Sequence, residues 1–440
     1  LTVVIFLIAY RIGQSPLGRV LKAIREDERA ALAIGKNVVG FKVLVFMVAG
    51  ALAAVAGSTF AHYQSFINPF SITLHASIFI VALVVLGGTA NLYGTVVGAV
   101  LLVGLPEALR FLQADQEIVD ALRTLIYGVL LILFMRFRPE GFVPEYTRFG
   151  RRPAAPAPGS TSAQAPPVSA LEVATARAER AVGELALRAQ GLSKNFGGIR
   201  AVVGLDLTLP RGRITALVGP NGAGKTTVFN LLTGFLQPDQ GSVWLADRQL
   251  DREPPWRRVR AGLARSFQDV RLFERMTVLD NVLVAIPNQP GENLFHLFFS
   301  PRVVAQAERA NREKAMAYLR FVGLEAKADE LAGSLAYGEQ KLVALARLLA
   351  TEAEVLLLDE PAAGVDLYWV DRILELLRQL TAAGKTICLV EHNLEAVTAV
   401  ADHACFLDVG RKIAEGTPAQ LMADRDLTER YFGMRGATAP

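Results

Sequence analysis

Long apolar runs dominate the first third of the chain and are separated by short polar segments. The runs that approach the length of a membrane helix are Val43–His62, Ile72–Leu86, Leu92–Phe111 and Ile118–Met135. A helix that crosses a bilayer of about 30 Å needs roughly 20 apolar residues. Leu1–Tyr10 is apolar but shorter, so we interpret it as the end of a helix that begins before Leu1. The pattern predicts a partial transmembrane domain over residues 1–143, with about four full spans.

The polar segments between these runs differ in charge. Between Arg11 and Lys42 basic residues far outnumber the acidic Glu26, Asp27 and Glu28, whereas Tyr63–Thr73 contains neither Lys nor Arg. Cytoplasmic loops of membrane proteins are enriched in Lys and Arg. We therefore expect residues 11–42 to be cytoplasmic and residues 63–73 to be external. This predicts a multi-pass membrane protein in contact with lipid, with residues 11–42 on the cytoplasmic side.

Small residues gather in two of the apolar regions, Ala49–Gly57 and Gly87–Gly98. Close helix packing is one interpretation. An unwound backbone that lines a substrate path is the other. His62, His75 and Glu107 are further candidates for substrate contacts, although a histidine at a membrane interface usually has no such role.

A stretch rich in Pro, Ala, Ser and Gly follows the last apolar run, from Arg151 to Ser169. This composition cannot bury enough apolar surface to fold. Ala170–Leu187 is rich in Ala with interspersed Glu and Arg, which favours a helix. We interpret residues 144–184 as a linker between two domains.

The second half of the chain has a different pattern. Ile214–Val218 and Val355–Leu358 are short, uninterrupted apolar runs of the kind that form buried parallel strands. Gly219–Thr227 connects the first run to a predicted helix and has the spacing of a phosphate-binding loop. Its glycines allow backbone N–H groups to surround phosphate, Lys225 neutralises the outer phosphates, and the Thr226 hydroxyl can bind Mg²⁺.

Composition agrees with this division into two parts. Apolar residues make up 52% of the chain, and the mean hydropathy of +0.33 is high for a soluble protein. The net charge of +4 gives no reason to expect a nucleic-acid partner. Cys388 and Cys405 each lie within a strand-like apolar run, which predicts reduced core cysteines.

Further motifs after residue 185 resemble those of ABC ATPases. The resemblance implies an α/β P-loop domain with a helical subdomain over residues 185–436, which binds ATP and Mg²⁺. It assigns ATP binding to the aromatic Phe196, expected to stack on adenine, and to Gly219, Asn221, Gly222, Ala223, Gly224, Lys225, Thr226 and Thr227. The metal would be held by Thr226, Gln268 and Asp359, the last at the end of an apolar strand.

The same resemblance implies roles for four more positions. Glu360 would polarise the attacking water, His392 would contact the γ-phosphate, and Gln268 would reach both the metal and the water. Asp366 fits a loop that crosses between the two ATPase domains of a dimer. The segment expected to face the partner's ATP is Leu335, Ala336, Tyr337, Gly338 and Glu339.

Ala336 stands where ABC proteins usually carry a serine whose hydroxyl bonds the γ-phosphate. Losing one hydrogen bond to a charged group is worth about 1.5 to 3 kcal/mol. Backbone N–H groups and the following helix dipole remain. We therefore expect weakened hydrolysis, not its loss.

The membrane part is similar to the C-terminal half of a permease of the branched-chain amino acid ABC importer family, on the segments Ser15–Gly35, Gly87–Gly98 and Phe137–Gly141. Within it, Arg29–Gly35 resembles the short helix by which such permeases contact an ATPase; a solvated amphipathic helix is the alternative. Tyr337 and Glu339 are likewise similar to the ATP-binding subunits of that family. The resemblance implies a fused permease and ATPase.

The implied partners are a second permease subunit, a second ATP-binding subunit or another copy of this chain, and an extracytoplasmic binding protein. The implied function is ATP-driven import of branched-chain or related amino acids. Urea, amides or other small acids are alternative substrates, and a low-turnover ATP-binding regulatory protein is an alternative of another class. An ABC exporter fits less well, because the permease resemblance argues against it.

Overall fold

The structure, a computed structural model, describes residues 1–64, 66, 74–88, 91–110, 125, 128–129, 132–133, 136–137, 141, 184–391, 394–424 and 427. The chain forms two compact units. One consists of Leu1–Gly13 and Val43–Ser162, and the other of Gln14–Lys42 and Ala163–Pro440. Most of the predicted linker, residues 144–184, lies outside the described residues, so its boundaries stay a prediction.

The first unit is helical. Its helices are α1 (Thr2–Gly13), most of α4 (Val38–Gln64), α5 (Leu74–Gly87) and α6 (Leu92–Arg110). Among the described residues, α4 alone is long and apolar enough to cross a membrane, while the apolar stretches Thr2–Gly13, Ser77–Gly87 and Leu92–Gly104 are shorter. Most of the predicted span Ile118–Met135 lies outside the described residues.

Helices α5 and α6 pack closely through glycines. A Cβ atom on Gly87 would lie 2.3 Å from the carbonyl oxygen of Gly94, and one on Gly98 would lie 2.7 Å from that of Leu83. Such distances exclude any side chain, so the backbones approach as small residues allow. The turn between the helices is stabilised by Asn91, whose Oδ1 accepts hydrogen bonds from the N–H groups of Tyr93 and Gly94 at 2.9 and 3.2 Å. Close packing, the first interpretation of these small residues, is thus confirmed for Gly87 and Gly98.

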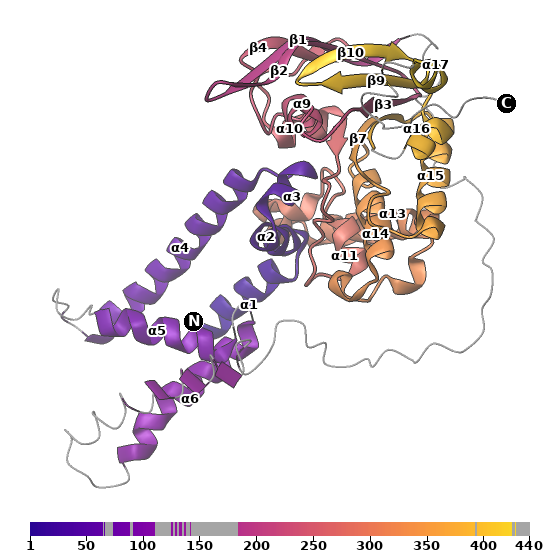
Figure 1. Cartoon of the computed structure of the whole chain (residues 1–440). Helices are drawn as coiled ribbons and strands as arrows, with labels where there is room; N and C mark the ends of the chain where they lie inside the picture. Colours follow the sequence, from indigo (N-terminus) through magenta and orange to yellow (C-terminus); the bar gives the residue numbers. More distant parts are fainter. Residues whose placement is uncertain are drawn as a thin grey trace. The chain divides into compact units, whose positions relative to one another are not determined.

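The second unit contains two sheets (Figure 1). An antiparallel sheet has the order β2-β1-β4-β5, formed by β1 (Leu185–Phe196), β2 (Ile199–Pro210), β4 (Gln240–Leu245) and β5 (Arg248–Gln249). The other has the order β10-β9-β3-β8-β7-β6, formed by β3 (Ile214–Val218), β6 (Leu263–Arg265), β7 (Val355–Asp359), β8 (Thr386–Val390), β9 (His403–Asp408) and β10 (Arg411–Gly416). All pairs in it are parallel except β9 with β10. The helix expected over Ala170–Leu187 is wrong at its end, because Leu185–Leu187 pair with both β2 and β4.

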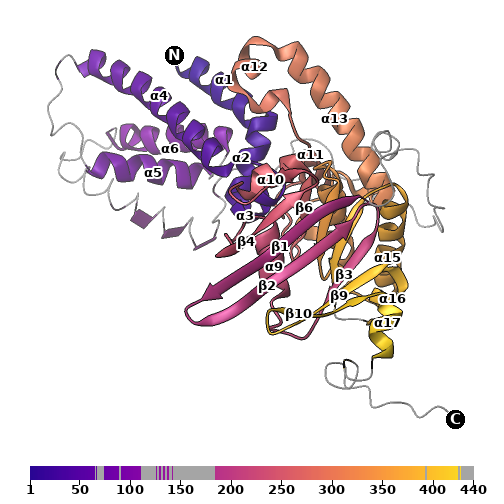
Figure 2. The ribbon, with the colours of Figure 1, turned by 90° about the horizontal axis from the view of Figure 1, so that it is seen from above.

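Every residue of β3, β7 and β8 is buried, as uninterrupted apolar runs in a parallel sheet require. The helices that follow or cover the strands are α9 (Lys225–Leu232), α10 (Pro255–Ala261), α15 (Leu367–Ala382), α16 (Leu394–Val400) and α17 (Pro418–Ala423). A helical group forms the other side of the unit, away from β1 and β2 (Figures 1 and 2): α11 (Val278–Leu283), α12 (Leu294–Phe299), α13 (Pro301–Val322) and α14 (Tyr337–Leu349), with the short helices η3 (Pro290–Glu292), η4 (Glu325–Lys327) and η5 (Ala332–Ser334).

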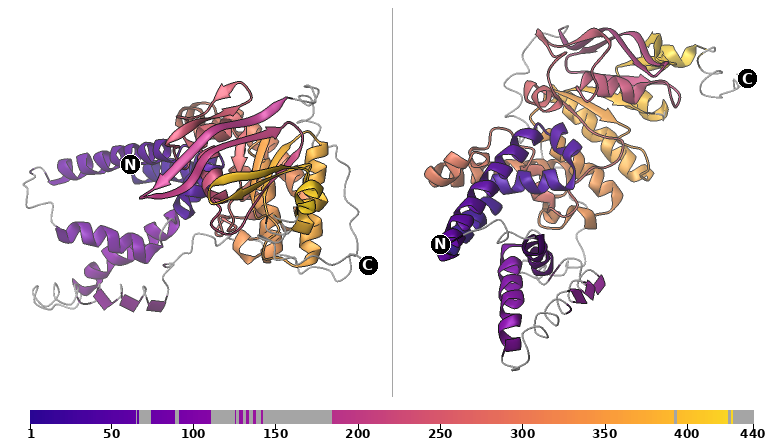
Figure 3. Two further views of the ribbon diagram at one scale, coloured as in Figure 1. Left: turned by 45° about the horizontal axis from the view of Figure 1, so that its top comes forward. Right: turned by 90° about the vertical axis from the view of Figure 1, so that its left-hand side faces the viewer.

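The segment Gln14–Lys42 belongs to this second unit, although it lies between apolar helices in the sequence. It forms α2 (Pro16–Glu26) and α3 (Glu28–Ala33), which lie against the helical group (Figure 3). Val20, Ile24, Ile34 and Val38 are at most 6% exposed and share one core cluster with residues of α11, α13 and α14. Burying four such side chains stabilises the contact by about 6–12 kcal/mol as an upper estimate.

Candidate functional site

The loop after β3 has backbone contacts that only glycine permits. A Cβ atom on Gly219 would lie 2.1 Å from the carbonyl oxygen of Leu407, and Gly224, with φ near +101°, would place one 2.5 Å from the carbonyl oxygen of Ala201. Helix α9 begins directly afterwards at Lys225, so its free N–H groups and positive dipole end point into the loop. Residues 219–227 therefore form a cradle for phosphate.

Lys225 is held inside this loop. Its Nζ donates hydrogen bonds to the carbonyl oxygens of Gly219 and Pro220 at 2.7 and 2.9 Å. Burial lowers the pKa of Lys225, and the charges of Glu360 and Asp359 oppose that shift. Lys225 thus interacts electrostatically with both carboxylates, so all three groups belong to one site.

The two carboxylates lie at the carboxyl end of β7, which is separated from β3 by β8 in the sheet. Asp359 is 2% exposed, and its N–H donates to Ser266 Oγ at 3.0 Å. Glu360 has a left-handed backbone with φ of 49°, and its N–H donates to the carbonyl oxygen of Val390 at 2.9 Å. Gln268 Nε2 donates to Glu360 Oε2 at 3.1 Å. The structure therefore brings together Gln268, Asp359 and Glu360, three of the residues that the sequence singled out.

Arg265 is a member of this site that the sequence analysis missed. Its Nη2 lies 3.3 Å from Asp359 Oδ2, and its Nη1 donates to Asn230 Oδ1 at 2.6 Å. The guanidinium carbon lies 4.9 Å from the ring centroid of Phe267 and 5.7 Å from that of Phe235. Burial is the main reason that the pKa of Arg265 falls to about 10. A charged residue within a buried strand was the available signal, because such a charge needs a partner.

The segment Leu335–Glu339 begins helix α14. Ala336 is the N-cap and has no side chain that could cap, so Glu339 provides the stabilisation: its Oε2 accepts the N–H of Ala336 at 3.2 Å. Lys327 Nζ holds both oxygens of Glu339 at 2.7 and 2.9 Å. The N-terminal turn of α14 is therefore ordered without the usual serine.

Asp366 caps α15, where its Oδ1 accepts the N–H of Trp369 at 3.2 Å. The Trp369 ring covers Gly338 so closely that a Cβ atom on that glycine would lie 2.6 Å from it. The structure thus packs the start of α15 against the start of α14. Phe196, at the end of β1, is 43% exposed and has Lys194 Nζ 5.7 Å from its ring centroid. His392 lies outside the described residues, so its role stays a prediction.

Helices α2 and α3 are joined to the helical group by ion pairs. Lys36 is 2% exposed, and its Nζ lies 2.5 Å from Glu292 Oε1 and 3.1 Å from the carbonyl oxygen of Ile286. Arg19 pairs with both Asp280 and Glu308. These charged contacts were not predicted from the sequence, because the partners lie more than two hundred residues apart.

The N-cap of α3 is Asp27, one residue before the helix that carries the predicted motif Arg29–Gly35. Its Oδ1 accepts the N–H of Ala30 at 2.9 Å, and its Oδ2 accepts a hydrogen bond from Arg271 Nη1 at 2.9 Å. Asp27 thus caps the helix that carries this motif and joins its start to Arg271.

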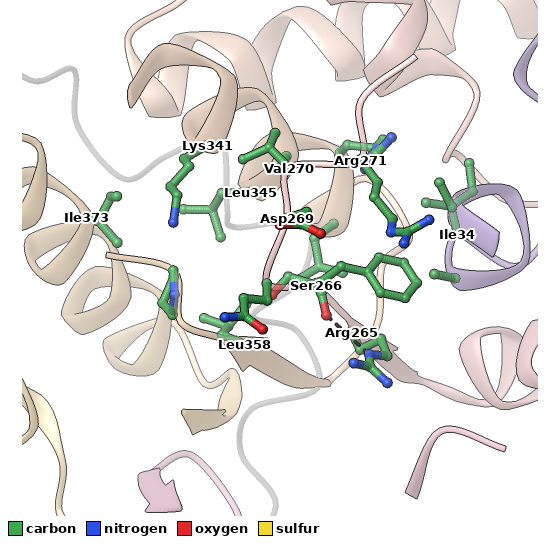
Figure 4. Close-up of a pocket in the computed structure, with 18 of the residues that line it drawn as sticks. Ile34, Arg265, Ser266, Asp269, Val270, Arg271, Lys341, Leu345, Leu358 and Ile373 are labelled. Atoms are coloured by element: carbon green, nitrogen blue, oxygen red, sulfur yellow. Dashed lines mark hydrogen bonds between the residues drawn. The ribbon is translucent and has the colours of Figure 1, made fainter. Parts of the chain in front are cut away.

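A pocket connects this docked segment with the site. Its wall includes Ala30, Ala33 and Ile34 of the docked segment, residues Arg265 to Arg271, and Lys341 and Leu345 of α14 (Figure 4). Gln268 is part of the same wall. Residues of α3 therefore share one pocket wall with the segment that carries Gln268 and Arg265.

These features define a class of protein. A phosphate loop follows one strand of the sheet, and two carboxylates lie at the end of another strand of the same sheet, one of them in contact with a glutamine. Together they form the site of a P-loop ATPase.

Comparison with known proteins identifies the family. Residues 202–363 match the family model described as ABC transporter, and residues 1–135 match that described as branched-chain amino acid transport system / permease component. The chain belongs to the ABC transporter family, as a fusion of a permease component with an ATP-binding component. The predicted fold class, a helical permease-like region followed by an ABC ATPase domain, is thereby confirmed, as is the ATPase activity coupled to transport.

The ATPase part is similar to the high-affinity branched-chain amino acid transport ATP-binding proteins BraF of Pseudomonas aeruginosa, 38% identical over 248 residues, and LivG of Escherichia coli, 39% identical over the same length. Each comparison covers 56% of this chain and 97% of the relative. A solved structure of the ADP conformation of MJ1267, an ATP-binding cassette of an ABC transporter, is 33% identical and covers 56% of this chain and 97% of that one, with a TM-score of 0.49.

Proposed function

We propose that this chain imports branched-chain or related amino acids across the cytoplasmic membrane of a bacterium, using ATP hydrolysis. The observation that carries the proposal is the docking of α2 and α3 into the core of the ATPase unit, where α3 lines the pocket that holds Gln268. A regulatory ATP-binding protein would not need a segment between two apolar helices to be buried beside its catalytic glutamine. The names of the two relatives and of the permease family support the substrate class.

The site suits ATP with Mg²⁺. The chemistry of the donor set is that of a magnesium site, since Thr226 supplies an exposed hydroxyl, Asp359 a carboxylate and Gln268 an amide. Bound Mg²⁺ would supply neutralisation of the phosphate charge. Arg265 holds Asp359 in one orientation before any ligand arrives, which lowers the cost of ordering it.

Within that site we assign four roles. Lys225 neutralises the outer phosphates from within the loop. Glu360 orients the attacking water, and its carboxylate is aimed by the hydrogen bond from Gln268. His392, which follows the buried strand β8 after one residue, contacts the γ-phosphate. Phe196 stacks on the adenine with the exposed face of its ring.

The ATP-binding domain would act as a dimer with a second ATP-binding subunit or with another copy of this chain. In that dimer Leu335–Glu339 of one subunit faces the ATP held by residues 219–227 of the other, and Asp366 lies at the crossing between them. A second permease subunit completes the membrane part, several spans of which come from this chain, and an extracytoplasmic binding protein delivers the substrate.

Movement of the ATPase unit would reach the membrane part through the docked segment, because ion pairs hold this segment to the ATPase unit and α4 follows it in the sequence. Lys36 is anchored by Glu292 and Arg19 by Asp280 and Glu308, while α4 runs from Val38 without interruption to Gln64. Since a helix is stiff along its axis, a shift of α3 against the segment of Gln268 moves the start of α4. Buried charges fix the register of such a contact more than its strength.

The test is uptake of labelled leucine by cells that lack the gene and express either this chain or its Glu360→Gln variant. Glu375→Gln, on the exposed face of α15, serves as the matched control. We expect uptake with the unaltered chain and with the control, and its loss with Glu360→Gln. If cells that lack the gene take up leucine normally but fail to take up urea or an amide, the substrate assignment would change from leucine to that compound. Equal ATP hydrolysis by membranes with Glu360→Gln would refute the transport ATPase assignment.

A further inference from the structure

A buried lysine on the first turns of α14 contacts the turn that carries Glu360. Lys341 is 8% exposed, and its Nζ donates a hydrogen bond to the carbonyl oxygen of Glu360 at 2.9 Å. The same ammonium lies 5.4 Å from the ring centroid of Tyr337, one turn earlier in the helix. Lys341 therefore joins the segment Leu335–Glu339 to the catalytic turn of the same subunit.

A buried acid holds the other side of that turn. Glu391 directly follows β8, is 3% exposed, and accepts the N–H of Ala362 at its Oε1 at 3.0 Å. Glu360 and Ala362 thus have their backbone groups held by two side chains of opposite charge from two different elements. Burial lowers the pKa of Lys341, and the charges of Glu391 and Glu360 oppose this effect, so the two side chains belong to one electrostatic cluster.

The turn itself needs such support. Glu360 has φ of 49°, a left-handed conformation that is unfavourable for a non-glycine residue. Conformations of this kind persist only where their surroundings hold them. Lys341 and Glu391 each form a hydrogen bond with the backbone of this turn. The direction of the Glu360 side chain therefore depends on where α14 and the end of β8 lie.

We propose that Lys341 and Glu391 are positioning residues that transmit the state of the segment Leu335–Glu339 to Glu360 of the same subunit. This inference rests on the proposed dimer, in which that segment faces the partner's ATP while Glu360 acts on its own. ATP bound by the partner subunit then moves the start of α14, and Lys341 moves the turn that carries Glu360. The site to which this Glu360 belongs thereby becomes competent for hydrolysis. This contact links the two sites of a dimer through each subunit. Glu391, which directly precedes His392 in the sequence, extends the link to the end of β8.

The structure provides a matched control for the variant Lys341→Met. Lys385 is also 8% exposed, and its Nζ also donates to a main-chain carbonyl, that of Ala353 at 2.7 Å. Burial likewise lowers the pKa of Lys385. Lys385→Met therefore removes a similar buried charge and hydrogen bond at a place that has no contact with the catalytic turn.

The experiment measures ATP hydrolysis by the purified full-length chain against ATP concentration, together with binding of a fluorescent ATP analogue and thermal unfolding. We expect Lys341→Met to lower kcat about 10- to 100-fold, as for a lost hydrogen bond to a charged group. We also expect its Hill coefficient to fall to about 1, while the binding constant changes less than about twofold. Lys341→Arg should restore part of kcat, and Lys385→Met should change unfolding only. Glu391→Gln keeps the acceptor for Ala362 and should lower kcat less than Glu391→Ala.

Two results would overturn the inference. One is a kcat and Hill coefficient for Lys341→Met equal to those of the unaltered chain. The other is a loss that Lys385→Met reproduces, since that would reveal a general effect of removing a buried lysine. Failure of the proposed import function is separate, because it would appear as absent leucine uptake while these ATPase measurements remained as expected.

Discussion

Removing the charge of Lys36 should weaken the contact between the docked segment and the rest of the ATPase unit. Lys36 is 2% exposed and Glu292 is 11% exposed, so Lys36→Met leaves a mostly buried carboxylate without its partner. Breaking a buried ion pair on one side costs about 3–5 kcal/mol. Against an apolar contribution of about 6–12 kcal/mol from Val20, Ile24, Ile34 and Val38, the segment should stay docked but open far more often. A cost of about 3 kcal/mol corresponds to a factor of roughly 150 in that opening.

Hydrogen exchange measures this opening directly, because an amide in a docked helix exchanges only when the helix is released. We expect the amides of α3 to exchange about 100-fold faster in Lys36→Met than in the unaltered chain. Replacing both partners, Lys36→Met with Glu292→Met, should restore most of the protection, since no unpaired charge remains. Amides of the buried strand β7 provide the internal control. Unchanged exchange in α3 for the single variant would refute the reasoning, and so would equal acceleration in α3 and β7.

Three further outcomes are expected. Ala336→Ser adds the missing hydroxyl at the N-cap of α14 and should raise kcat/KM for ATP about 10- to 100-fold, measured as phosphate release; a fall would contradict the role assigned to this position. Arg265→Met removes the ion pair of Arg265 with Asp359 and should raise the Mn²⁺ concentration needed for half-maximal binding of a fluorescent ATP analogue, with Arg265→Lys intermediate; identical metal dependence would exclude a positioning role. Burial would raise the pKa of Glu415, but hydrogen bonds from Lys412 and His403 outweigh this effect and lower the pKa. Glu415 therefore stabilises the fold above about pH 4.5, and this contribution is lost as the pH falls. Thermal unfolding of Glu415→Gln should show a smaller loss between pH 5 and pH 3 than the unaltered chain, and an equal loss would contradict this assignment.

The replacement of serine by Ala336 has a structural counterpart in Glu339. The carboxylate of Glu339 accepts the N–H of Ala336 and is itself held by Lys327, so the helix start does not need a hydroxyl for its own order. The missing hydroxyl therefore concerns only the phosphate that would face this segment. This separation is why weakened hydrolysis, and not a disordered helix, is the expected consequence.

Local sequence determined much of this protein because the relevant physics is local. The strands at Ile214 and Val355 follow from uninterrupted apolar runs, and the loop at Gly219 follows from glycines, a lysine and a threonine within nine positions. The carboxylates Asp359 and Glu360 could be placed at a strand end for the same reason. Charge asymmetry between loops assigned residues 11–42 to the cytoplasm, which agrees with their packing against the ATPase.

Tertiary structure alone decided which distant residues meet. Arg265 and Asp359 are 94 positions apart, and Lys36 and Glu292 are 256 apart, so no periodicity or spacing could pair them. A charge that looks solvated in the sequence, such as Lys36, becomes a buried anchor only when another element covers it. Likewise Lys341 and Glu391 lie within two residues of positions that the sequence singled out. Their common contact with the turn at Glu360 exists only because the start of α14 meets the ends of β7 and β8. The sequence thus predicts which chemical groups are present, while the packing of its elements determines which of them act together.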